Sequence, residues 1–166
     1  MMLGRKRDER RREQAEMAGR AADEAVAALA RDDIDAARNE LTAAPKKLDF
    51  AEVGWKVALA QALIDLKAGK TKAGVQGLER ICERLDQTDL SRDDKGYLRL
   101  FCLYRASEAT KDGKAPASLR AQVEDFRFDR TMITPSLMQR FPLKKIEDKP
   151  VAAPPKPKGA GDAIDL

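Results

Sequence analysis

Apolar residues recur every three or four positions along most of the chain, which is the spacing of one face of an α-helix. The clearest case covers two adjacent segments, 51–68 and 71–85, separated by Gly69 and Lys70. The first segment carries Trp55, Leu59, Leu63 and Leu66 on one face, and the second carries Val75, Leu78, Ile81 and Leu85. The pattern therefore predicts an antiparallel helical hairpin at the centre of the fold.

The same spacing predicts further helices over residues 5–30, 34–44, 93–112, 116–127 and 135–141. Their ends coincide with residues that cap or stop helices. Asp32 or Asp33, Asp49 and Ser91 are suitable N-caps, because a short oxygen-bearing side chain accepts a hydrogen bond from a free backbone N–H. Pro45 and Gly113 end helices.

Two features predict close helix–helix contacts. The face of segment 15–30 consists largely of alanine. Gly74 and Gly77 lie inside the second helix of the central hairpin, where each destabilises the helix by about 1 kcal/mol relative to alanine. Glycine at such positions indicates a neighbouring helix that leaves no room for a side chain.

Composition supports an all-α fold with flexible termini. Charged residues make up 36% of the chain and aromatics only 5%, so alternating β-strands are not expected. We divide the chain into a charged, basic N-terminal extension (1–14), a helical domain (15–143) and a disordered tail rich in Pro, Ala and Lys (144–166). The helices form either stacked antiparallel hairpins or an irregular bundle.

Three helix pairs follow one another, over about 15–45, 50–86 and 93–127, with turns near Asp32, Gly69 and Gly113. Small residues precede each turn (Ala25, Ala62, Ala106), and large apolar residues follow the first two turns (Leu41, Leu78). This arrangement resembles tetratricopeptide-like repeats. The resemblance implies a right-handed stack of hairpins with a concave groove that binds peptides.

Catalytic, metal-binding and cofactor-binding residues are not predicted. The chain has no histidine, and its two cysteines, Cys82 and Cys102, are expected to be buried reduced thiols. The sequence Gly69-Lys70-Thr71 matches only the end of a phosphate-binding loop and falls in a predicted hairpin turn. The acidic pairs at 32–33 and 93–94 are interpreted as helix N-termini. We therefore expect a protein without enzymatic activity or cofactors.

The N-terminal extension is the most basic part of a chain whose net charge is +4. One hypothesis is that this stretch contacts nucleic-acid phosphates; the alternative is a solvated polar helix. The candidate phosphate contacts are Arg5, Lys6, Arg7, Arg10, Arg11 and Arg12. Acids at 8, 9 and 13 interrupt the run, and no aromatic residue is present for base stacking.

Aromatic residues and methionines supply the candidate protein-binding residues: Trp55, Tyr97, Tyr104, Phe128, Met132, Met138 and Phe141. The run 126–143 mixes aromatics, Met and Arg, which is typical of protein interfaces, but it equally suits a cap over the last hairpin. Trp55 is expected to lie in the core rather than at a binding surface. The terminal residues 163–166, apolar and acidic, are a further candidate motif for capture by a partner.

No apolar run of about 18 residues and no apolar leader segment is present, so a cytoplasmic protein without a membrane partner is expected. The Ala- and Arg-rich composition suggests a bacterial source. The leading hypothesis is a helical-repeat adaptor or scaffold that binds a segment of a protein partner. The alternative is a nucleic-acid-associated protein that uses residues 5–12, and self-association is possible in either case.

Overall fold

The computed structural model describes residues 2–110, 116, 117, 119, 120 and 129–143. Within these residues all regular structure is helical, which confirms the predicted all-α class. The expected helix over 116–127 and the expected tail over 144–166 lie wholly or largely outside the described residues. The specific likeness to tetratricopeptide repeats stays a prediction.

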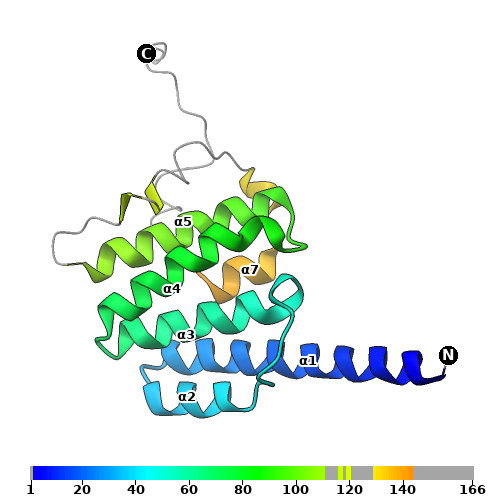
Figure 1. Cartoon of the computed structure of the whole chain (residues 1–166). Coiled ribbons are helices and arrows are strands. Elements are labelled where there is room, and N and C mark those ends of the chain that lie inside the picture. The colour runs from blue at the N-terminus through cyan, green and yellow to red at the C-terminus, as the bar shows by residue number, and fades with distance from the viewer. Residues whose placement is uncertain (1, 111–115, 118, 121–128, 144–166) are drawn as a thin grey trace.

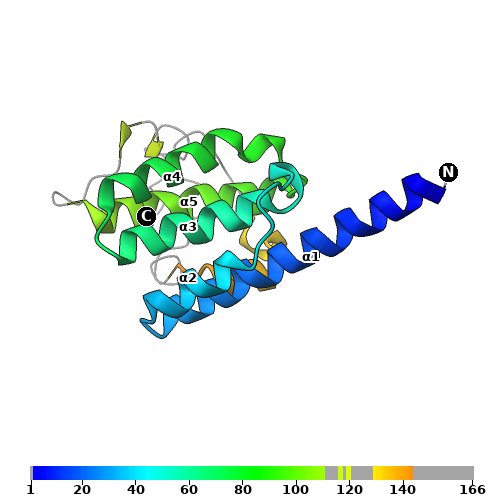
Figure 2. The same ribbon diagram turned by 60° about the horizontal axis from the view of Figure 1, so that its bottom comes forward.

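The first hairpin consists of α1 (Met2–Ala30) and α2 (Ile34–Thr42), which lie side by side in Figures 1 and 2. Asp32 adopts a left-handed conformation with φ of 62° in the turn, and the Asp33 carboxylate caps α2 by accepting from the Ala36 amide at 3.0 Å. The expected alanine face of α1 is buried in a cluster with Ala37, Ala60 and Ile64. Small side chains here allow α1 to approach both α2 and α3 closely.

The second hairpin begins with a π-helical turn, η1 (Phe50–Gly54), and continues as α3 (Trp55–Lys67) and α4 (Thr71–Arg84). The sequence predicted one helix from residue 51. The chain starts in a wider turn because the Asp49 carbonyl accepts from the Gly54 amide at 2.9 Å and its carboxylate accepts from the Ala51 amide at 3.1 Å. Gly69 has a φ of +87° between α3 and α4, as its predicted position after a helix requires.

The predicted close contact at Gly74 and Gly77 is confirmed. A methyl group placed on Gly74 would lie 2.6 Å from Leu66 Cδ2 and 3.0 Å from the Ala62 carbonyl oxygen. One placed on Gly77 would lie 3.1 Å from Ala62 Cβ. The two glycines therefore fix the distance between α3 and α4.

A short 3₁₀ turn, η2 (Leu85–Gln87), leads to α5 (Arg92–Ala109), whose first turn is capped by Ser91 accepting from the Asp94 amide at 3.1 Å. This helix carries the largest buried side chains, with Tyr97 and Phe101 both 1% exposed. It packs against α4 beyond the second hairpin (Figure 1). The main core thus forms between α3, α4 and α5.

The last described segment contains a 3₁₀ turn, η3 (Arg130–Met132), and a short helix, α7 (Pro135–Arg140). Its apolar residues at four-residue spacing, Ile133, Leu137 and Phe141, are all buried in the main core. The ring of Phe141 meets Phe101 of α5 edge-on, with centroids 5.5 Å apart. For these residues the structure supports intramolecular packing, one of the two interpretations open for the run 126–143.

One part of α1 lies outside this packing. Its N-terminal half projects beyond the rest of the molecule in both views (Figures 1 and 2). Residues 4–14 are all exposed, and Ala18 is the first buried residue of the helix. We call residues 4–14 the overhang.

Candidate functional site

A cleft lies between α1, η1 and the start of α3, and we call it the N-terminal cleft. Its volume is about 620 Å³. Val53 and Trp55 line its floor and are buried, and Leu90 from the loop before α5 is half-buried beside them. An apolar floor at the junction of three elements is typical of sites that accept an apolar anchor residue.

Charged side chains surround this floor. Acids at the rim are Glu16 and Asp23 from α1, Glu52 from η1 and Asp89 from the loop, and the bases are Arg20 and Lys56. Within the described part of the chain, no ion pair joins Glu16, Glu52 or Asp89 to another residue. The rim therefore presents an excess of negative charge, although the whole chain is basic.

One carboxylate beside the cleft, that of Asp23, joins three helices. Asp23 of α1 lies 3.5 Å from Lys56 Nζ of α3 and 3.1 Å from Arg140 Nε of α7. Its side chain is 25% exposed, so solvent screens these pairs less than those on a fully open surface. At one end of the cleft, the first ion pair joins α1 to α3 and the second joins α1 to α7.

Polar contacts from α5 hold the segment around α7 in turn. The Tyr97 hydroxyl donates to the Phe141 carbonyl at 2.6 Å in a buried site. The Asp94 carboxylate, 5% exposed, accepts from the Thr134 amide at 2.8 Å and from its hydroxyl at 2.7 Å. Arg140, which pairs with Asp23, therefore lies in a segment that hydrogen bonds from α5 hold in place.

The predicted partner-binding residues do not gather on one surface. Trp55, Tyr97 and Phe141 are buried, which agrees with the favoured core position of Trp55. Tyr104 and Met138 are half-buried, and Met132 is 64% exposed. Phe128 lies outside the described residues. Of the set, only Trp55 lines the N-terminal cleft.

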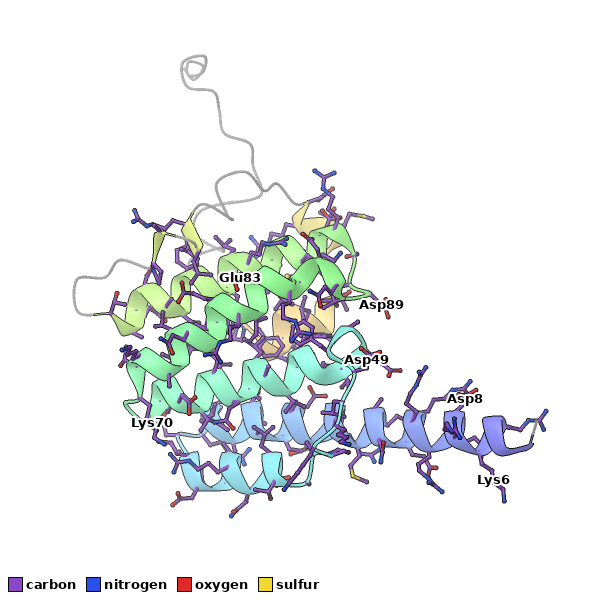
Figure 3. All side chains as sticks on the ribbon, in the orientation of Figure 1. Lys6, Asp8, Asp49, Lys70, Glu83 and Asp89 are labelled. Atoms are coloured by element: carbon purple, nitrogen blue, oxygen red, sulfur yellow. The ribbon has the colours of Figure 1, made fainter. Side chains whose placement is uncertain are left out.

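The predicted phosphate contacts all lie on the overhang, and each is exposed: Arg5, Lys6, Arg7, Arg10, Arg11 and Arg12. Figure 3 shows Lys6 and Asp8 on opposite sides of this helix. Arg11 also lines a second, smaller cleft of about 270 Å³, together with Lys47 from the loop between α2 and η1. The structure thus places one basic residue of the body, Lys47, next to the overhang.

The cysteines are buried and reduced, as predicted. A hydrogen bond between the Cys82 and Cys102 side chains, together with burial, raises the pKa of Cys102 well above its usual range. Such a thiol stays protonated and is a poor nucleophile. The described residues contain no group of three or more Cys, Asp or Glu side chains arranged to hold a metal ion. No described helix has the length and apolarity needed to cross a membrane.

Sequence patterns missed the residues that build the N-terminal cleft. Glu16, Glu52 and Asp89 lie far apart in the chain, and each is an ordinary surface acid in its own segment. Asp23 likewise occupies a polar position of α1. Their joint role depends on the packing of α1 against η1 and α3, and no local signal reports it.

Comparisons with known proteins identify no relative of this chain. No protein-family model matches the chain, and no curated protein or solved structure matches it.

Proposed function

We propose that this protein is a non-enzymatic adaptor that binds a segment of a protein partner in the N-terminal cleft. The observation that carries the proposal is the combination of an apolar floor with three rim acids, Glu16, Glu52 and Asp89, that form no ion pair within the described part of the chain. This combination fits a segment with one apolar anchor residue flanked by lysine or arginine. The anchor would lie over Val53, Trp55 and Leu90.

The size of the cleft supports a short segment rather than a whole domain surface. Its 620 Å³ falls within the range of about 300–1,000 Å³ that is usual for small-ligand and side-chain pockets. Burial of one large apolar side chain contributes about 1.5–3 kcal/mol. Ion pairs at an open rim contribute little affinity but improve the association rate and the choice of partner. We therefore expect weak, reversible binding.

The walls of the cleft support the same interpretation. Asp23 joins α1 to α3 and α7 through Lys56 and Arg140, so the cleft does not have to be assembled when a segment arrives. A preformed site avoids part of the ordering entropy that binding otherwise costs. The partner segment, rather than this protein, then supplies most of the conformational change.

Selection from a randomised peptide display library tests this proposal with the full-length protein. We expect enrichment of peptides that contain an apolar residue next to lysine or arginine. A synthetic peptide of the enriched sequence should bind wild-type protein and bind Glu16→Lys at least tenfold more weakly.

Glu24→Lys is the matched control, because Glu24 is an exposed acid of the same helix that does not line the cleft. It changes the net charge equally and should leave peptide affinity within a factor of two. Equal losses in both variants would show that only net charge matters. A selection that enriches no basic peptide would also contradict the proposal.

A further inference from the structure

The overhang of α1 carries a second interaction surface that is independent of the N-terminal cleft. Residues four apart lie one above the other on a helix. Lys6 lies over Arg10 and Arg7 over Arg11, so these four residues form one continuous basic face. Gln14 continues that face toward the body of the molecule.

The acids lie at the edges of this face and on the other side of the overhang: Glu9 and Glu13 follow Lys6 and Arg10 by three residues, and Asp8 precedes Arg11 by three. At the same four-residue spacing, Arg5 is followed by Glu9 and Arg12 by Glu16, so the remaining arginines alternate with acids. Figure 3 shows Asp8 pointing away from Lys6. The overhang is therefore not a uniformly mixed polar helix, because one of its sides contains only basic residues and Gln14, and the acids border that side or lie opposite it.

Two features of this arrangement oppose helix stability in the isolated protein. Like charges four residues apart repel each other, and cations near a helix N-terminus oppose the helix dipole. The first turn of α1 contains no acid to compensate. Within the described residues, Lys6, Arg7, Arg10 and Arg11 form no ion pair. An anionic partner would remove both repulsions at once.

We propose that the basic face formed by Lys6, Arg7, Arg10 and Arg11 binds the phosphate backbone of double-stranded DNA, with the overhang lying in the major groove. The overhang is about 16 Å long at 1.5 Å per residue. The major groove of B-DNA is about 12 Å wide and accommodates an α-helix. Lys47, exposed at the edge of the body beside Arg11, contacts a flanking phosphate.

The composition of the overhang favours duplex DNA over other anionic partners. Residues 4–14 contain no apolar or aromatic side chain. A protein interface needs apolar or aromatic anchors, a membrane-surface helix needs an apolar face, and single-strand binding relies on aromatic stacking. The deep, narrow major groove of duplex RNA does not admit a helix.

Fluorescence anisotropy with a labelled duplex DNA of random sequence tests the proposal on the full-length protein. Each phosphate contact contributes about −0.9 to the slope of log K against log salt concentration, or about eightfold in affinity at 0.1 M salt. The double variant Arg7→Gln/Arg11→Gln should bind about sixtyfold more weakly than wild type at that salt concentration. Its slope should be shallower by about 1.8.

Arg5→Gln/Arg12→Gln is the matched control, because it removes the same charge from the acid-bearing face and should lose less than fivefold. All four substituted positions are exposed, and circular dichroism should show unchanged helix content. Equal losses in the two double variants would overturn the assignment to one face. The proposal also fails if wild type does not bind DNA at low salt, if duplex RNA binds equally well, or if phosphatidylserine vesicles are bound in preference to DNA.

Discussion

Substitution of Gly74 by alanine probes the contact that sets the distance between α3 and α4. A helix interior normally gains stability from this change, by about 1 kcal/mol. At Gly74 the new methyl group would lie 2.6 Å from Leu66 Cδ2 and 3.0 Å from the Ala62 carbonyl oxygen. Leu66 is half-buried and can rotate partly away, but the Ala62 carbonyl belongs to the backbone of α3. Relief of the overlap therefore requires α3 and α4 to move apart.

The balance of the two effects predicts net destabilisation. Insertion of a methyl group into a packed contact costs about 1–3 kcal/mol, and a backbone neighbour places Gly74 in the upper half of that range. After subtraction of the gain in helix propensity, Gly74→Ala should lower the free energy of unfolding by about 1–2 kcal/mol. Urea denaturation followed by circular dichroism measures this difference. At about 4 °C per kcal/mol, the melting temperature should fall by roughly 4–8 °C.

Gly19→Ala provides the control. A methyl group on Gly19 of α1 would meet only Val53 Cγ2 at 3.9 Å, an ordinary contact, so this variant should be more stable than wild type by up to about 1 kcal/mol. In a double-mutant cycle, prior removal of the Leu66 side chain should reduce the effect of Gly74→Ala by about 1 kcal/mol. If Gly74→Ala raises stability as Gly19→Ala does, α3 and α4 have room for a methyl group at this position, which contradicts the prediction.

Three further predictions concern buried polar groups. Tyr97→Phe should destabilise by about 1–2 kcal/mol in urea denaturation, because the buried Phe141 carbonyl loses its donor; an unchanged midpoint would contradict this. Asp94→Asn should lower the free energy of unfolding by about 2 kcal/mol, because the Asp94 carboxylate accepts two hydrogen bonds from Thr134. Retention of wild-type stability would show that the charge is irrelevant. The raised pKa of Cys102 means that above about pH 8.5 the unfolded chain loses a proton that the folded protein keeps, so stability should fall as pH rises. Cys102→Ala should flatten that decline, and parallel pH profiles for the two proteins would refute it.

The local structure of this chain is predictable from its sequence. Gly69 takes the left-handed conformation after α3, and Asp33, Asp49 and Ser91 accept backbone hydrogen bonds as expected. These features depend on neighbours a few residues away, so the sequence contains the whole signal. The π-helical turn at 50–54 was not predicted, because it depends on which amides the Asp49 carbonyl accepts, and helical spacing does not encode that choice.

Polar contacts between residues far apart in the chain could not be predicted from the sequence. Asp94 has the sequence signature of an acid at a helix N-terminus, and it does occupy the first turn of α5. Its carboxylate, however, binds Thr134, forty residues away, and so fixes the segment that carries Arg140. Arg140 then meets Asp23 at one end of the N-terminal cleft. A change at Asp94 should therefore alter the peptide binding proposed for the cleft without touching any residue that lines it, whereas the DNA binding proposed for the overhang should be unchanged.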